Sequence, residues 1–335
     1  MHRRAHLSLF LMLALLFAGH VNPAPAALRA GETAPGFTLK DLKGESFSLQ
    51  SIKTNPVTVL FFFDAGSRAS QEALLTLDKL ANDYKEAGLL VWGVTRSEHA
   101  AVRTFMDKAH PRFPVLLDDG AASRDYQAKL VLPVICTLSP GLKILDYYQG
   151  GGKTIENMMI SLAEHQLNRR QTMLAKAISK KVTADNPASV PAAMVKGYAA
   201  LKEGKLDQAS QVFTGLAKEK GEAQIAGEEG QAAVLASRGE TGKALALVNK
   251  IEQKAPDRSY AAMIKGDLLA GQGKTKEAGK AYELAAAGKG AAPFQQAEAL
   301  NRLGQYQART GNFKEARKFY DKAVDLDPYY LEPTS

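Results

Sequence analysis

Short apolar runs alternate with helical periodicity through the first half of the chain. Residues 57–63 and 89–94 are almost entirely apolar, which is typical of buried β-strands. Between them, Leu74, Leu77 and Leu80 recur at the spacing of one helix face. The pattern therefore predicts a strand, a helix and a second buried strand in succession.

The same alternation continues to about residue 167. Further strands or hairpins are expected over residues 37–49, 113–117 and 134–148, and further helices over 100–109 and 154–165. Strands that alternate with helices predict a mixed sheet with helices on its faces. Residues 31–167 are accordingly expected to form one α/β domain.

The composition changes after this domain. Residues 168–188 begin as a basic helix that Pro187 interrupts, and we expect them to connect two domains as a linker helix. Beyond residue 188 the chain is rich in Ala, Gly, Lys and Glu and has almost no β-branched runs, so an all-helical region is predicted.

A pattern of five positions recurs four times in this helical region. It consists of a small residue, a turn glycine, an alanine, an aromatic or aliphatic residue and a further apolar residue: Gly197, Gly204, Ala209, Phe213 and Leu216 in the first unit. The other units begin at Ala232, Gly266 and Gly304 with the same internal spacing, so the period is 34 to 38 residues. Each unit is expected to form two helices that approach closely at the small residues, while the aromatic or aliphatic residue fills the gap to the next unit. The pattern resembles the tetratricopeptide repeat, which implies four repeats in a solenoid over residues 189–330.

The N-terminus has the features of a secretory signal. Arg3 and Arg4 precede an apolar stretch of 13 residues, and small residues follow up to Ala26. The alternative, a membrane anchor, needs about 20 apolar residues. We therefore expect cleavage near Ala26, a periplasmic or secreted protein, and no stable membrane insertion after signal removal.

Composition and charge narrow the possible functions. The chain has 335 residues, of which 45% are hydrophobic and 23% charged, which suits two globular domains. Its formal net charge is +8, but the basic residues are scattered and no basic run alternates with aromatic residues, so no nucleic-acid partner is expected.

Several motifs of the first domain resemble one branch of the thioredoxin superfamily. They are the opening segment 34–39, the aromatic strand end at 61–65, the segment 113–118, and Leu132-Pro133-Val134 at the position of a cis-proline. Together they resemble the TlpA-type and redoxin branch over roughly residues 31–167. The resemblance implies a thioredoxin-like fold and a Cys-x-x-Cys motif at the start of the helix after the first buried strand.

This chain has Ser67 and Ser70 at the two cysteine positions that the resemblance implies. A serine hydroxyl forms no mixed disulfide and has no redox cycle, so the catalytic site is expected to be degenerate. Helix capping is the simplest role for both serines. Serine nucleophile chemistry would need a nearby base, and neither His99 nor His110 stands at a spacing that suggests one.

The single cysteine, Cys136, lies within an apolar strand pattern. Burial would raise its thiol pKa and leave it inert, although an intermolecular disulfide or a sensor role is the alternative. His99, His110 and His165 are isolated from one another and from the cysteine in the sequence, so neither a metal site nor a cofactor is expected.

Two surfaces are candidates for binding other proteins. By the resemblance, Pro133 would present backbone groups to an extended peptide, or it would be a plain structural turn. In the repeats, the first helices carry Tyr198, Lys202, Lys265, Arg302 and Arg309. These residues predict a weakly basic groove for an acidic segment or a C-terminal carboxylate, unless they are only solvated charges.

Two functional hypotheses follow from these observations. The first is an exported, redox-inactive binding module, a scaffold or chaperone that holds envelope proteins or peptides through the repeat groove. The second is a thiol-disulfide oxidoreductase or peroxide-reducing enzyme of the redoxin family, for which a partner would have to supply the thiols.

Overall fold

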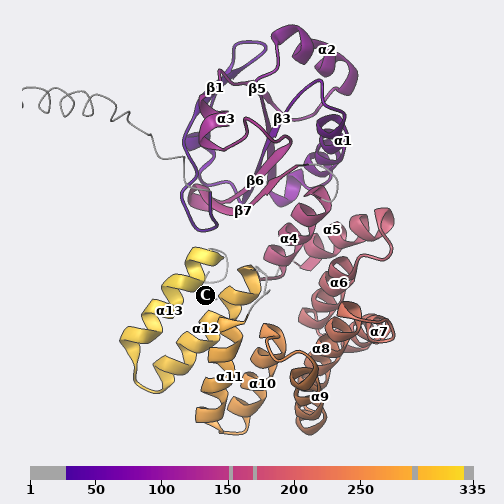
Figure 1. Ribbon diagram of the computed structural model, residues 1–335, viewed down its shortest axis with the longest axis vertical. Helices are drawn as coiled ribbons and strands as arrows, with labels where there is room; N and C mark the ends of the chain where they lie inside the picture. The colour runs from indigo at the N-terminus through magenta and orange to yellow at the C-terminus, as the bar shows by residue number, and fades with distance from the viewer. Residues whose placement is uncertain (1–27, 151–153, 169–171, 289–292, 328–335) are drawn as a thin grey trace, which may run out of the picture.

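The computed structural model describes residues 28–150, 154–168, 172–288 and 293–327. These residues form an α/β domain followed by a run of helices, as the sequence predicts (Figure 1). The predicted signal peptide lies outside the described residues. Among the described residues, no helix is both long enough and apolar enough to cross a bilayer.

The described part of the first domain contains a seven-stranded sheet of order β2-β1-β5-β4-β3-β6-β7. Strands β3, β4 and β5 run parallel, and the other neighbouring pairs are antiparallel. The strands are β1 (Thr38–Asp41), β2 (Ser46–Ser48), β3 (Val57–Phe63), β4 (Leu89–Thr95), β5 (Val115–Leu117), β6 (Val134–Ser139) and β7 (Lys143–Gln149). All residues of β3 are buried, which confirms the interpretation of its apolar run.

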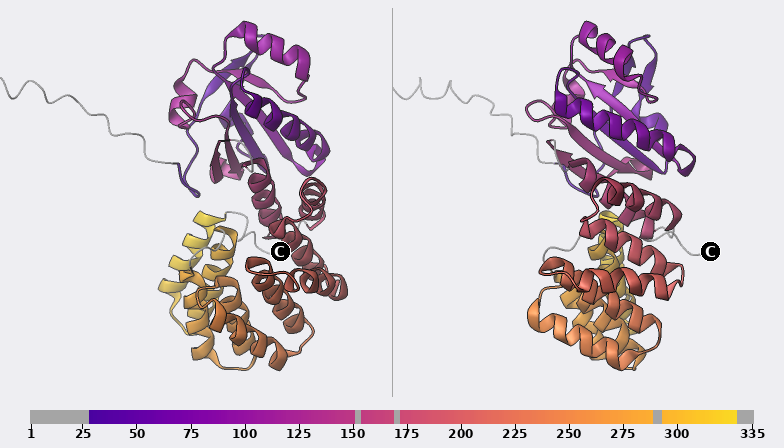
Figure 2. Two further views of the ribbon diagram at one scale, coloured as in Figure 1. Left: turned by 45° about the vertical axis from the view of Figure 1, so that its right-hand side comes forward. Right: turned by 90° about the vertical axis from the view of Figure 1, so that its right-hand side faces the viewer.

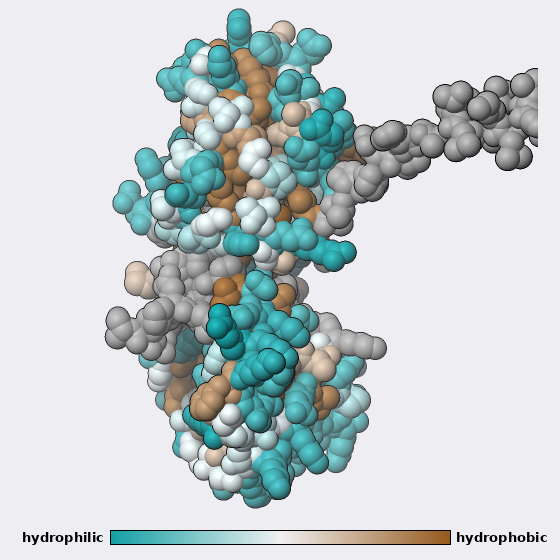
Figure 3. All heavy atoms as spheres, turned by 90° about the vertical axis from the view of Figure 1, so that its left-hand side faces the viewer, coloured by the Kyte–Doolittle hydropathy of each residue, from teal (hydrophilic) through white to brown (hydrophobic). Residues whose placement is uncertain are grey.

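Helices cover one face of this sheet more fully than the other. The helices of the domain are α1 (Arg68–Asp83), α2 (His99–Ala109), α3 (Ala121–Asp125) and α4 (Thr154–Asn168). Residues of α1, α2 and α4 share one core cluster with Phe61 and Phe63 of β3. The opposite cluster contains Leu60, Phe62 and Trp92. Viewed from the side away from α1, apolar residues form a band down the first domain (Figure 3).

Helix α3 is a short element that the sequence pattern does not predict. It has only five residues, and its N-terminus depends on Asp118, whose carboxylate accepts hydrogen bonds from the N–H groups of Gly120, Ala122 and Ser123. Such capping satisfies N–H groups that have no partner inside the helix. A single turn is too short to show a helical period.

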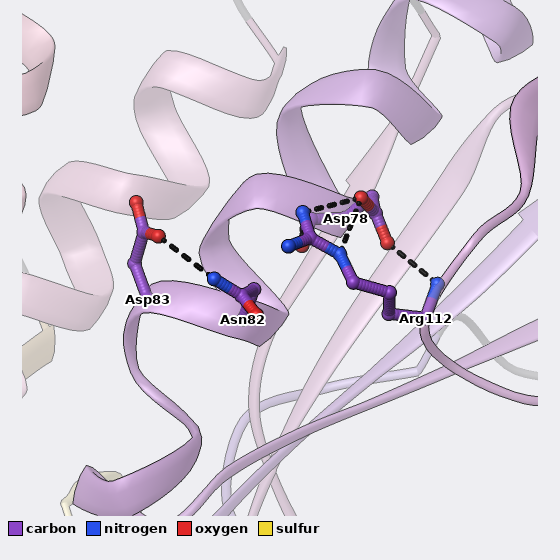
Figure 4. Close-up of polar contacts among 4 residues, drawn as sticks. All are labelled: Asp78, Asn82, Asp83 and Arg112. Carbon is purple, nitrogen blue, oxygen red and sulfur yellow. Dashed lines mark hydrogen bonds and ion pairs between the residues drawn. The ribbon is translucent and has the colours of Figure 1, made fainter.

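The loop before β5 is fixed to α1 by an ion pair. The guanidinium of Arg112 donates to the Asp78 carboxylate at 3.0 and 2.7 Å, and the Arg112 backbone N–H donates to it at 2.6 Å (Figure 4). Partial burial raises the pKa of Asp78, but the hydrogen bonds from Arg112 outweigh it and lower the pKa below its usual value.

The expected connection between the domains contains a packed helix. Helix α5 (Thr172–Asp185) buries Leu174, Ile178 and Val182 in the core cluster that also holds residues of α1 and α4. The hydrophobic core is therefore continuous from the sheet into the helical region.

Eight further helices are described after α5, in antiparallel pairs. They are α6 (Val190–Lys202), α7 (Leu206–Ala217), α8 (Glu222–Ser237), α9 (Thr241–Lys254), α10 (Ser259–Gly271), α11 (Thr275–Ala287), α12 (Pro293–Arg309) and α13 (Phe313–Leu326). The turn glycines of the sequence pattern have positive φ, such as 73° at Gly204 and 84° at Gly311. These turns need the left-handed conformation that glycine adopts without strain.

Phe213 shows how the repeat pattern determines packing. A Cβ atom at Gly197, on the paired helix, would lie 2.5 Å from its ring, and one at Gly230, on the next unit, 2.1 Å from it. The ring thus fills the space left by glycines on two helices. Gly266 with Tyr282 and Gly304 with Tyr320 repeat the contact within a unit. The predicted close approach at small residues is confirmed.

The helical region curves back to the first domain, so that α13 lies beneath it (Figure 2). A Cβ atom at Gly31 would lie 2.1 Å from the carbonyl oxygen of Asp325. Nearby, His165 of α4 stands between two carboxylates, with Nε2 3.4 Å from Asp146 of β7 and Nδ1 3.2 Å from Asp327. The end of the last repeat therefore contacts both the sheet and α4.

Candidate functional site

The two serines lie at the N-terminus of α1, and both are used structurally. Ser67 is the N-cap residue, and its Oγ accepts a hydrogen bond from the Ser70 N–H at 3.5 Å. Ser70 is fully buried, and its Oγ accepts from the Asp64 N–H at 3.2 Å. The predicted capping role is confirmed for Ser67, while Ser70 fixes the loop that follows β3.

A hydrogen-bond network holds this loop against the end of β4. The Asp64 carboxylate accepts from the Gly66 N–H at 2.9 Å and from the Ser97 hydroxyl at 3.2 Å. Ser97 Oγ in turn accepts from the Ala65 N–H at 3.0 Å. No hydrogen bond joins a histidine to Ser67 among the described residues. The geometry thus offers a rigid polar loop and no activated nucleophile.

Cys136 lies away from α1, on the opposite side of the sheet. It belongs to the cluster with Leu60 and Trp92, and its exposed fraction is 0%. Burial raises the pKa of its thiol far above the ordinary range. The prediction that Cys136 is buried is confirmed.

The loop before β6 carries the proline predicted to be cis. The Leu132–Pro133 peptide bond is cis, and the Pro133 carbonyl accepts from the Gly150 N–H at 2.8 Å. That carbonyl is already used within the fold, so the role of Pro133 in binding a peptide stays a prediction. Just before it, Leu130 is 96% exposed and Val131 47% exposed.

Two hollows adjoin this end of the domain. A cavity of about 280 Å³ lies between the ends of β3 and β4, α3 and the loop before β6. Its lining includes Asp64, Arg96, Lys129 and Leu132. A larger hollow of about 550 Å³ lies between α1 and α2, and its lining is mainly apolar.

The structure places the five groove candidates of the repeats in different surroundings. Tyr198 packs its ring against Phe213 and Tyr260, with centroids 5.1 and 5.0 Å apart. Lys265 pairs with Glu252 at 2.6 Å, and Arg302 pairs with Asp267 at 3.1 Å. Lys202 and Arg309 are exposed. Two of the four predicted positive charges are therefore balanced within the fold, and the basic groove stays a prediction.

His165 is isolated from the other histidines and from the cysteine in the sequence, but in the fold it lies between two carboxylates. Its exposed side-chain fraction is 2%, and Asp146 and Asp327 flank it. Burial lowers its pKa, but the two carboxylates outweigh burial and hold the pKa well above the usual value. Asp327 stands 162 residues further along the chain, so no local pattern could reveal this contact. Among the described residues, no group of three or more His, Cys, Asp or Glu side chains is arranged to hold a metal ion.

Arg96 and Lys129 are cavity residues that the sequence reasoning did not single out. They belong to no motif, and they line one cavity only because the fold places the loop after α3 beside the ends of β3 and β4.

Comparisons with known proteins agree with this two-part architecture. The profile of the AhpC/TSA family matches residues 30–144. A tetratricopeptide repeat-like profile matches residues 149–300, and a tetratricopeptide repeat profile matches residues 297–330.

Three curated relatives cover parts of the first domain. A thiol-disulfide oxidoreductase ResA of Halalkalibacterium halodurans is 30% identical over 124 residues, which are 37% of this chain and 70% of that protein. The thioredoxin-like protein YneN of Bacillus subtilis is 30% identical over 102 residues, and a chloroplastic peroxiredoxin Q of Populus jackii is 31% identical over 100. These last two matches cover 30% of this chain, and 59% and 46% of the relatives.

Among solved structures, a putative thiol:disulfide interchange protein DsbE from Chlorobium tepidum matches with a TM-score of 0.38 and 22% identity, over 41% of this chain and 96% of that one. The sequence matches carry the assignment. Through residues 30–144 the chain belongs to the AhpC/TSA family of thioredoxin-like proteins, and tetratricopeptide-type repeats follow that domain.

Proposed function

We propose that this protein is an exported, redox-inactive member of its family that binds segments of other cell-envelope proteins as a scaffold or chaperone. The observation that carries the proposal is the chemistry at the start of α1. Ser67 caps the helix and Ser70 lies in its first turn, and both hydroxyls accept hydrogen bonds within the fold.

Thiol-disulfide exchange needs a thiolate that reaches its substrate. The first turn of α1 would favour a thiolate, because a helix N-terminus lowers a thiol pKa. The chain's single cysteine lies instead in the core on the other side of the sheet and is fully buried. No thiol of the chain is therefore positioned for exchange.

The repeat region supports a binding role. Tetratricopeptide-type repeats commonly present a concave surface to peptides or partner proteins. Arg309 and Lys202 supply exposed positive charge on the first helices of two repeats. Export is supported by the N-terminal sequence alone, and cell fractionation with N-terminal sequencing of the mature protein tests it.

Insulin reduction with dithiothreitol and peroxide consumption test redox inactivity. We expect no turnover above background from the mature protein or from its Cys136→Ser variant. Turnover that persists in Cys136→Ser, with contaminating reductases excluded, contradicts a binding-only role.

A gain-of-function variant tests the placement of the site. The double variant Ser67→Cys/Ser70→Cys should form a disulfide that titrates reversibly, because Ser67 is the N-cap residue of α1 and Ser70 lies in its first turn. Ser67→Cys combined with Ser51→Cys, on an exposed turn outside the site, is the matched control and should not cycle. If the Ser67/Ser70 pair forms no disulfide, the site is misplaced.

The second candidate is a thiol-disulfide oxidoreductase or peroxide-reducing enzyme that works with thiols from a partner. The names of the relatives favour it, since they are a thiol-disulfide oxidoreductase and a peroxiredoxin. Turnover that appears only when a cysteine-bearing envelope protein is added would support this candidate.

A further inference from the structure

The cavity between the ends of β3 and β4 has a charge pattern that the proposed function does not use. Its lining is mixed: it includes the buried apolar side chains of Phe62, Phe63 and Val94 and the polar side chains of Ser97 and Ser123. Its outer lining carries two exposed cationic side chains, Arg96 and Lys129. Two cations beside a small, partly polar cavity favour an anionic group that binds at it.

Neither cation is neutralised by an ion pair among the residues that the structure describes. No ion pair joins Arg96 or Lys129 to another described residue, although Arg124 in the same region pairs with Asp125 at 2.9 Å. The one carboxylate of the lining, Asp64, accepts from Gly66 and Ser97 and so serves the loop after β3. The mouth of the cavity therefore carries an excess of positive charge.

An exposed aliphatic pair continues this surface along the chain. Leu130 and Val131 follow Lys129 directly and are 96% and 47% exposed. Large aliphatic side chains at adjacent positions are rarely this exposed to solvent on a folded protein. Leu132, the next residue, lines the cavity, so the aliphatic pair and the cavity are adjacent.

We propose that the cavity and residues 129–132 form one docking surface for an extended protein segment in which an acidic residue stands beside a large apolar residue. The carboxylate would bind Arg96 and Lys129, and the apolar side chain would cover Leu130 and Val131. The volume of about 280 Å³ suits a single side chain rather than a folded partner. This inference rests on the proposed binding function and names the chemistry of the segment that the thioredoxin-like domain selects.

Fluorescence polarisation with short labelled peptides tests the proposal on the full mature chain. The probe carries one Glu between two Leu residues, and matched probes carry Gln or Lys in its place. We expect the Glu probe to bind at least about tenfold more tightly than the Gln probe, because a hydrogen bond to a charged group contributes that much or more. Its affinity should fall as salt rises.

Variants locate the binding. Arg96→Gln/Lys129→Gln should remove the preference for Glu, and Leu130→Ser should weaken the Glu probe several-fold. Arg124→Gln is the matched control, because it removes a nearby exposed arginine outside the cavity lining, and it should bind as the wild type does. Circular dichroism checks that each variant is folded.

Equal binding of the Glu and Gln probes, or no binding of either, overturns the proposal. So does full affinity in Leu130→Ser, or a loss of affinity in Lys202→Gln/Arg309→Gln rather than in the cavity variant, which would place the peptide in the repeats. The redox assays test the proposed function independently of the peptide-binding experiments. Turnover would overturn the proposed function, whereas inactivity with unselective peptide binding would overturn only the docking surface.

Discussion

Replacing His165 by alanine should loosen the contact between the last repeat and the thioredoxin-like domain. His165 of α4 lies between Asp146 of β7 and Asp327, and the three side chains are 2%, 10% and 0% exposed. Asp146 also accepts hydrogen bonds from Ser161 at 2.7 Å and Thr137 at 3.2 Å, so it stays fixed when His165 is removed. The variant leaves two buried carboxylates without their shared partner.

The expected cost is large because the charges are buried. Removing one member of a buried ion pair destabilises a protein by about 3–5 kcal/mol, against a total of roughly 5–15 kcal/mol for a domain. Urea unfolding followed by the fluorescence of Trp92, the chain's single tryptophan, reports on the sheet, where this side chain is 4% exposed. Arg68→Ala is the matched control, because its ion pair with Glu72 is exposed and its loss should change little.

The pH dependence provides a second check on His165. The pKa of His165 is higher in the folded protein than in the unfolded chain. The stabilisation by protonated His165 is therefore fully present below about pH 6.5, the pKa of an unfolded histidine, and is lost as the pH rises through the folded pKa. Burial raises the pKa of Asp146, but hydrogen bonds and the charge of His165 outweigh burial and lower it. The stabilisation that ionised Asp146 contributes is therefore present above about pH 3.9, the pKa of an unfolded aspartate, and is lost as the pH falls through the folded pKa.

The difference in stability between the wild type and His165→Ala should thus be largest between about pH 4 and 6.5 and shrink towards alkaline pH. Burial raises the pKa of Glu164 to about 8, and the charge of His165 lowers it in part, so the titration of Glu164 belongs to the same pH-dependent difference. A difference below about 1 kcal/mol at pH 6, the size expected of an exposed pair, would refute the reasoning. A difference that does not change with pH would refute it as well.

Three further predictions follow from local contacts. Gly230→Ala should destabilise the repeats by about 1–3 kcal/mol in thermal unfolding, because its Cβ would enter the Phe213 ring. The control Gly215→Ala, with no atom within 4 Å of its Cβ, should stabilise the protein slightly. Equal effects of the two substitutions would contradict the packing. Asp78→Asn should lower stability by roughly 1–2 kcal/mol at pH 7, and the loss should diminish as pH falls through the lowered pKa of Asp78; urea midpoints at pH 7 and pH 3 measure it. Cys136 should react with a thiol reagent at pH 8 only after unfolding, because burial raises its pKa, and fast labelling of the native protein would show that it is accessible.

Much of the fold could be predicted because its signals are local. The apolar runs of β3 and β4 and the spacing of Leu74, Leu77 and Leu80 reflect burial within one element. Helix α3 was missed because a single turn has no period and depends on the Asp118 cap.

The features of the candidate site were likewise partly predictable from the sequence and partly not. The serines at the start of α1, the cap at Ser67 and the burial of Cys136 follow from the order of elements, so the sequence was sufficient for them. The pairing of Lys265 with Glu252 and of Arg302 with Asp267 joins different helices, and the sequence alone could not show that these charges are balanced.

By itself the sequence determined the class of each half of the molecule and the lack of an accessible thiol at the start of α1. Periodicity and residue chemistry depend on residues that are close together in the chain, so they can be recognised from the sequence alone. Only the tertiary structure decided which distant charges form pairs, such as His165 with Asp327, and that Arg96 and Lys129 line one cavity. Such contacts depend on how strands and helices are placed in space, because electrostatic attraction acts through distance between atoms and not through separation along the chain.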